Sequence, residues 1–95
     1  MPERTFEWDA DKAAANWRRH GVTFQQAAVA VTDPFAVEFL DDREDYGEER
    51  INLLGRFGRV ILHVTYTERG ERVRIISARR AMRHEQDDYY RENSR

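Results

Sequence analysis

The first third of the chain carries one short alternating segment and then an apolar pattern with helical spacing. Residues 5–8 alternate between polar and apolar side chains, which predicts a short strand. Asp9 is a favourable helix N-cap, and His20 followed by Gly21 provides a helix end at which glycine can adopt the left-handed conformation. The apolar stripe of the expected helix consists of Ala10, Ala13, Ala14 and Trp17. A helix with such small side chains should pack closely on its neighbour.

A second helix is expected after a very short connection. Thr23 and Gln26 have the spacing of a capping box, and Asp33 followed by Pro34 ends the helix. The apolar stripe of this helix consists of Phe24, Ala27, Ala28 and Val31. Two helices joined this closely predict a helical hairpin.

From residue 36 onward the pattern changes to the alternation typical of strands. Four strands are expected, at residues 36–40, 50–56, 60–67 and 72–78. The connections are a mobile acidic loop at residues 41–49 and turns at residues 55–58 and 68–71. Connections this short predict an antiparallel β-meander.

The chain ends in a predicted helix from about residue 82 to 92, with Met82, Gln86 and Tyr89 on one side. The resulting order is strand, helix, helix, four strands and helix, which predicts an α+β fold in a single domain of residues 1–95. Both N-terminal helices should cover one face of the sheet, since they have nothing else to bury against. The last helix can cover only part of the other face, which would leave a groove ringed by arginines.

Composition narrows the class of protein. The 95 residues are 40% hydrophobic and 36% charged, as in a small and rather polar globular domain. No apolar run reaches the length of a membrane span and no N-terminal secretory signal is evident, so we expect a cytoplasmic protein without membrane association. Cysteine is absent, and His20, His63 and His84 show no metal-ligand spacing. No metal or other cofactor is expected.

Charge is segregated along the chain, although the net charge is only −2. Residues 33–49 contain eight acids and one arginine, for a charge of −7. Residues 50–83 contain nine arginines and two acids, for a charge of +7. This asymmetry indicates an anionic ligand or a charged partner, unless the two segments pair with each other on adjacent strands.

The run from Val73 to Ala81 combines the last strand with a cluster of arginines directly before the final helix. A strand holds its side chains in fixed positions, and a guanidinium binds phosphate through a planar fork. This combination suits a protein that handles a phosphodiester.

Three groups of residues follow one another in a distinctive order between about Phe6 and Tyr90. The first consists of Phe6, Glu7, Trp8, Asp9, Lys12, Asn16, His20, Gly21, Val22 and Phe24. The second consists of Arg50 and Gly55, and the third of Ile75, Ile76, Ser77, Ala78, Arg79, Ala81, Glu85 and Tyr89. In order and spacing these residues resemble the BrnT toxins.

The resemblance implies a RelE-like fold and the toxin of a type II toxin–antitoxin system. It implies a metal-free endoribonuclease that cleaves RNA to arrest translation and is neutralised by a BrnA-type antitoxin with a ribbon-helix-helix DNA-binding part. The pair is then expected to repress its own promoter, so that the toxin meets DNA only indirectly, as a dimer within the antitoxin complex.

Metal-free RNA cleavage needs a base for the 2′-hydroxyl, an acid for the 5′-oxygen and positive charge for the phosphorane. Arg79 matches the family's Ser-x-Arg position and is expected to stabilise the transition state. Arg50, at another family position, is a second catalytic candidate, and Arg80 and Arg83 are expected to bind the RNA backbone. The alternatives are an ion pair between Arg79 and the acidic loop, and solvated surface charge for the other three.

Three further side chains are candidates for proton transfer or RNA contact. Glu85 and Tyr89 are four residues apart and share a face of the last helix. Glu85 is expected to act as a base or to orient an arginine, and Tyr89 to act as an acid or a stacking platform, with core packing as its alternative. His63 alternates with apolar residues and so points to the face of the sheet that the last helix covers only in part, here called the half-open face. It is expected to act there as a proton shuttle or RNA contact, or else to be a buried structural histidine.

Two other functions stay open. No unmistakable acid–base pair is present, so a degenerate toxin could act only through its antitoxin and promoter complex. A toxin of this fold could also act on a protein target such as gyrase.

Overall fold

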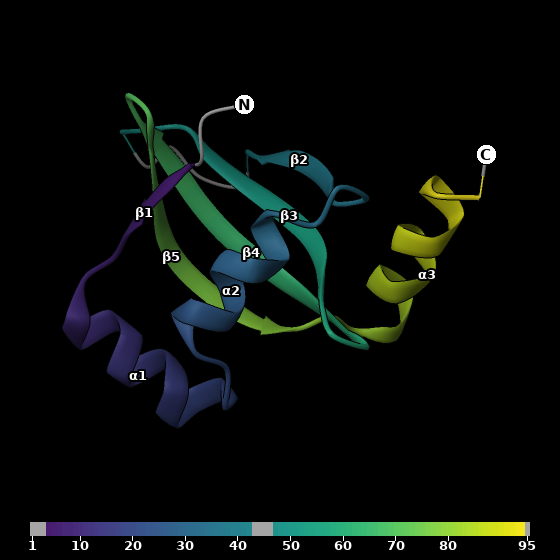
Figure 1. Ribbon diagram of the computed structural model, residues 1–95, viewed down its shortest axis with the longest axis horizontal. Helices are drawn as coiled ribbons and strands as arrows, with labels where there is room; N and C mark the ends of the chain where they lie inside the picture. The colour runs from purple at the N-terminus through teal and green to yellow at the C-terminus, as the bar shows by residue number, and fades with distance from the viewer. Residues whose placement is uncertain (1–3, 43–46, 95) are drawn as a thin grey trace.

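The computed structural model describes residues 4–42 and 47–94, which form an α+β fold in the predicted order (Figure 1). The strands are β1 (Thr5–Glu7), β2 (Val37–Asp41), β3 (Arg50–Phe57), β4 (Val60–Arg69) and β5 (Arg72–Arg80). The helices are α1 (Ala10–His20), α2 (Phe24–Val31) and α3 (Arg83–Glu92). The acidic loop predicted at residues 41–49 lies partly outside the described residues. None of the described helices is long and apolar enough to cross a bilayer.

The strands form one sheet in the order β1-β5-β4-β3-β2. β2 to β5 make the predicted antiparallel meander, and β1 adds in parallel to the first part of β5. β5 continues to Arg80, two residues beyond the predicted end, because Arg79 and Arg80 pair with His63 and Leu62 of β4. Arg79 is therefore held within a strand.

The predicted helix ends are confirmed. The Asp9 carboxylate accepts a hydrogen bond from the amide of Lys12 at 2.9 Å, and Gly21 ends α1 with a φ of 67°. Thr23 and Gln26 form the capping box of α2 in both directions, each bond at 3.0 Å. These local signals set where each helix begins.

The face of the sheet under α1 and α2 carries the main apolar core. α2 lies against β3, β4 and β5, whereas α1 lies against β5 (Figure 1). The largest of the fully buried side chains on this face are Tyr66, Phe24, Leu53, Ile75, Val64 and Val73. Their removal from water is the main source of stability in the fold.

The predicted apolar stripe of α1 is wrong. Three of its four members are exposed, namely Ala10, Ala14 and Trp17. The buried residue of α1 is Asn16, whose Nδ2 donates to the carbonyls of Val22 and Ala78 at 2.9 and 2.8 Å. Its Oδ1 accepts from the amide of Ala78 at 3.1 Å. Because these bonds satisfy a buried amide, they fix the rotation of α1 in place of apolar contact.

Gly55 was predicted in a turn at residues 55–58, but it lies within β3, and the turn is at Gly58 and Arg59. A Cβ atom at Gly55 would meet the carbonyl oxygen of Ala30 at 2.2 Å. The backbone of α2 therefore rests directly on β3 at this position, which only glycine permits.

α3 covers part of the opposite face, as predicted, but with a different side of the helix. Met82 is 54% exposed, and the buried residues of α3 are Glu85 and Tyr89. Tyr89 packs in a small apolar cluster with Leu54 and Ile61. The stretch of sheet beside this cluster carries polar side chains that line a pocket together with residues of α1 and α3.

Candidate functional site

The half-open face of the sheet contains a pocket of about 730 Å³. Side chains of β2 to β5 line it on one side, and the C-terminal end of α1 and the start of α3 line it on the others. The residues from the sheet are Phe39, Asn52, Leu54, His63, Thr65, Ser77, Ala78 and Arg79, and those from the helices are Arg19, His20, His84, Glu85 and Asp88. The pocket occupies the face on which the sequence predicts a groove.

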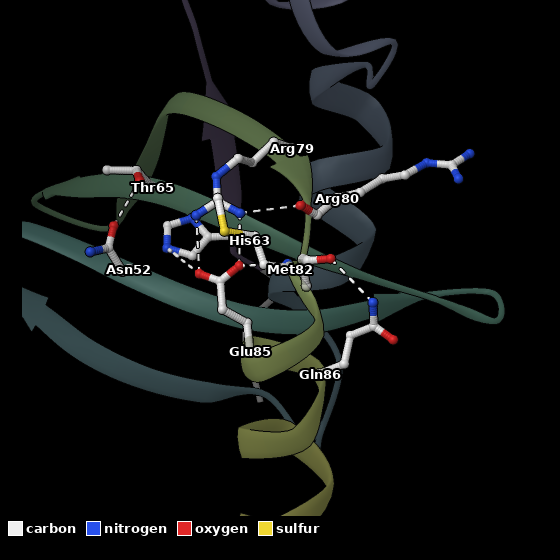
Figure 2. A network of polar contacts seen from close by, with 9 residues as sticks. Asn52, His63, Thr65, Arg79, Arg80, Met82, Glu85 and Gln86 are labelled. Carbon is white, nitrogen blue, oxygen red and sulfur yellow. Dashed lines mark hydrogen bonds and ion pairs between the residues drawn. The ribbon is translucent and has the colours of Figure 1, made fainter.

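Arg79 and Glu85 form a two-point ion pair in this pocket (Figure 2). Nη1 of Arg79 donates to Oε1 of Glu85 at 2.7 Å and Nη2 donates to Oε2 at 3.0 Å. Nη1 also donates to the carbonyl of Arg80 at 3.2 Å. Within the described chain, the Nε side of the guanidinium donates no hydrogen bond, and the side chain is 29% exposed. This second edge can form a bidentate hydrogen bond with two oxygens of an anion such as a phosphate.

The Glu85 carboxylate is an anchor for that guanidinium. Its side chain is only 10% exposed, and Oε1 also accepts a hydrogen bond from the amide of Met82 at 2.7 Å, which begins α3. Burial alone would raise the pKa of Glu85, but hydrogen bonds from Arg79 and the Met82 amide, with electrostatic interactions with His63 and Arg79, hold the pKa below its ordinary value of 4.5. Glu85 is therefore ionised at neutral pH and poorly suited to accept a proton.

His63 faces the same carboxylate from the neighbouring strand. Its Nε2 lies 3.7 Å from Oε2 of Glu85 (Figure 2). The residue His63 pairs in register with Arg79 across β4 and β5. The ring also meets Phe39 of β2 edge to face, with centroids 6.1 Å apart. His63 lines the pocket on the half-open face, as predicted, but the residue is only 9% exposed, as expected for the alternative of a buried structural histidine. A cation, a carboxylate and an imidazole thus meet in one site.

Tyr89 lies apart from these three residues. Its side chain is 3% exposed, and its hydroxyl donates to Oδ2 of Asp33 at 2.7 Å. Burial and the Asp33 carboxylate raise the pKa of Tyr89 to about 12. This environment favours the alternative in which Tyr89 packs in the core. Because its pKa is raised, the hydroxyl releases its proton less readily than a free tyrosine does.

The other predicted arginines do not line the pocket. Arg50 begins β3 two positions before Asn52, on the same face of the strand, and pairs in register with Asp41. Arg80 is exposed and lies opposite Leu62, whose side chain belongs to the covered face. The side chain of Arg83 is 88% exposed and lies 3.5 Å from Asp87.

The two charged segments pair in part on adjacent strands: Asp41 of β2 is in register with Arg50 of β3, and the amide of Arg56 donates to Oδ2 of Asp33 at 2.8 Å. Arg69 lies 3.8 Å from Glu48, both near the surface. The partner of Arg79 is Glu85, which belongs to neither the acidic loop nor the acidic segment. The arginine of greatest interest is therefore not neutralised by the described part of that loop.

Sequence reasoning missed the aromatic and polar side chains that accompany the ion pair. Phe39, Asn52, Thr65 and Ser77 all line the pocket. The alternation of each strand could have placed them on one face, but only the register between strands aligns them with His63. His20, interpreted as a helix cap, also reaches the edge of the pocket.

The described residues hold no group of three or more His, Asp or Glu side chains arranged to bind a metal ion. A search of curated proteins found no match. A family model described as the ribonuclease toxin BrnT of type II toxin–antitoxin systems matches residues 8–85. The match covers most of the chain and includes His63, Arg79 and Glu85. This chain belongs to the BrnT toxin family.

Proposed function

We propose that this protein is a metal-free endoribonuclease that arrests translation by cutting RNA. Membership of the BrnT family implies a ribonuclease toxin with an RNA substrate and an antitoxin partner. The metal-free cleavage mechanism is supported by the pair of Arg79 and Glu85 beside His63, because this pair presents an oriented guanidinium to an open pocket.

In this proposal the free edge of Arg79 binds the scissile phosphate. The 2′-hydroxyl attacks that phosphate, the bond from phosphorus to the 5′-oxygen of the next nucleotide breaks to leave a 2′,3′-cyclic phosphate, and the guanidinium stabilises the charge that develops on the phosphate oxygens. Since the cation is supplied by the side chain, the step requires no metal. Glu85 positions the guanidinium and keeps it from rotating away from the pocket.

His63 is the group that we assign to proton transfer. It lies beside Arg79 across the β4–β5 pair, and the pocket gives its ring access to a bound nucleotide. An imidazole suits both removal of a proton from a hydroxyl and delivery to a leaving oxygen near neutral pH. Tyr89 is assigned to packing of α3, and Arg50, Arg80 and Arg83 to peripheral RNA contacts.

The partner in this proposal is a BrnA-type ribbon-helix-helix antitoxin, encoded beside the toxin. Two toxin chains join that complex, and DNA is reached only through the antitoxin. The active protein is a single domain of residues 1–95 that acts in the cytoplasm on cellular RNA.

One observation favours a second, non-catalytic function. The end of the Arg79 guanidinium is fully occupied by Glu85, at 2.7 and 3.0 Å. If the pair served only to dock α3 on β5, the chain would be a degenerate toxin that acts through its antitoxin and promoter complex.

The test is induction in a bacterium with mapping of RNA 5′ ends. Wild-type protein should stop growth and create new RNA ends. Arg79→Ala should reduce cleavage by about 10²- to 10³-fold, as expected for loss of one charge-stabilising group. Arg72→Ala is the matched control, because Arg72 is an exposed arginine of the same strand that does not line the pocket.

Folding of each variant is checked by its thermal unfolding midpoint. A folded Arg79→Ala protein that still cleaves RNA at the wild-type rate would remove Arg79 from the mechanism. Intact RNA with wild-type protein that still binds its antitoxin would support the degenerate toxin, and damaged DNA would indicate a protein target such as gyrase.

A further inference from the structure

A row of side chains crosses the half-open face of the sheet next to the ion pair. Phe39 of β2 pairs in register with Asn52 of β3, Asn52 with Thr65 of β4, and Thr65 with Ser77 of β5. All four line the pocket, and we call them the polar row. His63 and Arg79 form the adjacent row, two residues further along the strands. Two strand residues span about 6.7 Å, so the two rows lie within the length of one nucleotide.

Asn52 presents unused hydrogen-bond donors in this row. Asn52 is a buried residue with 5% of its surface exposed. Its side-chain Oδ1 accepts a hydrogen bond from the hydroxyl of Thr65 at 2.7 Å. The amide nitrogen points away from Thr65 (Figure 2), and within the described residues it donates to no other group. Because Asn52 lines the pocket and this nitrogen has no protein acceptor among the described residues, it is suited to a ligand that carries an acceptor.

Phe39 supplies an exposed aromatic surface at the edge of the same row. It is 43% exposed, and it holds its position by an edge-to-face contact with His63. Unpaired RNA bases are recognised by stacking on aromatic rings and by hydrogen bonds to their edges. The row offers both features side by side, since Phe39 and Asn52 are register partners and both line the pocket.

We propose that the polar row is a nucleobase subsite, in which one unpaired base next to the scissile phosphate stacks on Phe39 and accepts a hydrogen bond from the Asn52 amide. This inference rests on the proposed function for the position of the phosphate at Arg79. Asn52 is then the residue that determines base preference at this position, and the substrate is single-stranded RNA. A base-paired duplex cannot place a base edge in a pocket on a sheet surface, since its bases are stacked and paired.

The first experiment measures kcat/KM for short single-stranded RNAs that differ in the base beside the cut. Phe39→Ala should lower kcat/KM by on the order of tenfold for every base, because stacking tolerates all bases. Asn52→Leu has a similar size without the amide and should reduce the preference between bases by about tenfold. Leu40→Ala is the matched control, since Leu40 is exposed on the same strand but on the opposite face.

The second experiment measures binding without cleavage. Nucleoside 5′-monophosphates are titrated into the protein, and the NMR signals of the Asn52 side-chain amide are followed. These signals should shift with the monophosphate of the preferred base and not with inorganic phosphate. Equal shifts with inorganic phosphate would overturn the subsite.

The outcomes separate this inference from the proposed function. If wild-type protein cuts RNA and both variants keep its rate and base preference, the subsite is wrong and the ribonuclease stands. If Phe39→Ala loses antitoxin binding but keeps full cleavage, the exposed ring belongs to a protein interface and the subsite is also wrong. If wild-type protein cuts no RNA but binds monophosphates through Asn52, the subsite stands and the ribonuclease is wrong.

Discussion

The two faces of the sheet are built from the same strands but have opposite characters. On the face under α1 and α2, Leu53 and Val64 are fully buried and pair in register between β3 and β4. One residue along each strand, Asn52 and Thr65 pair on the other face and line an open pocket. Alternation of side chains therefore divides each strand between a buried apolar face and an open face with polar side chains.

The difference matters because burial and reactivity have conflicting requirements. An apolar face gains stability from every contact removed from water. A site for an anionic ligand must keep polar groups accessible, which reduces the apolar area that this face can bury. Changes on the covered face should therefore alter stability first, and changes on the open face should alter activity first.

The largest expected effect is that of Gly55→Ala on the covered face. The added Cβ would lie 2.2 Å from the Ala30 carbonyl oxygen, so α2 must move away from β3. We expect the free energy of unfolding to fall by about 3 kcal/mol or more, measured by urea denaturation. Gly58→Ala is the control, because nothing lies within 4 Å of its added Cβ and only its φ of 60° is strained. Equal losses in the two variants would mean that helix contact at Gly55 is unimportant.

The next effect is that of Glu85→Gln on the open face. The substitution keeps the size of the side chain but removes the charge that anchors Arg79 at two points. We expect kcat for RNA cleavage to fall about 100-fold through misplacement of the guanidinium, with a smaller change in KM. The unfolding free energy should change less than in Gly55→Ala.

Asp87→Asn provides the matched control for that variant, since Asp87 is an exposed carboxylate on the same helix and does not line the pocket. A Glu85→Gln protein with normal kcat would show that Arg79 does not depend on this carboxylate. A loss of stability as large as that of Gly55→Ala would show that the pair belongs to the structural core.

The smallest effect tests the border between the two faces, where Tyr89 attaches α3 to the end of α2. Tyr89→Phe removes the hydroxyl that donates to Asp33 at 2.7 Å while keeping the buried ring. The unfolding free energy should fall by about 1.5 kcal/mol at pH 7, the usual loss for a hydrogen bond to a charged group. Cleavage activity should stay near the wild-type level, and a large loss of kcat would return Tyr89 to the mechanism.

The same pair should be sensitive to pH. Burial alone would raise the pKa of Asp33, but hydrogen bonds from the Phe35 and Arg56 amides and from Tyr89 hold it below its ordinary 3.8. This contribution to stability is present above the ordinary value and is lost as pH falls through the lowered one. At the alkaline end, the pKa of Tyr89 is raised from 10 to about 12, so its contribution is lost as pH rises through that interval. The difference in unfolding free energy between wild type and Tyr89→Phe should therefore become smaller at both extremes of pH. A difference that stays constant with pH would contradict these assignments.

Much of the fold could be predicted from local signals. Asp9, Thr23 and Gly21 mark the helix ends as predicted, since a cap depends on residues within one turn. Strand alternation placed His63 on the half-open face, and the strand before the last helix indicated Arg79 as a phosphate-binding candidate. The resemblance to the BrnT toxins was confirmed over residues 8–85.

Other features depend on contacts between distant segments. The apolar stripe of α1 was misjudged because Asn16 bonds to Ala78, 62 residues away, and no local pattern encodes that bond. Gly55 looked like a turn residue, but its role comes from the approach of Ala30. Similarly, the sequence offers Tyr89 as a candidate acid, and only the structure shows that its hydroxyl donates to Asp33.

The sequence by itself determined the element order, the helix ends and the set of polar residues that the strands could present, because these follow from spacing along the chain. Only the tertiary structure decided which of those residues meet. Register between strands places Asn52 and Thr65 in one row beside His63 and Arg79, and the docking of α3 brings Glu85 onto that arginine. The physical reason is that register and docking are fixed by cooperative burial and hydrogen bonding between distant segments, which local sequence does not specify.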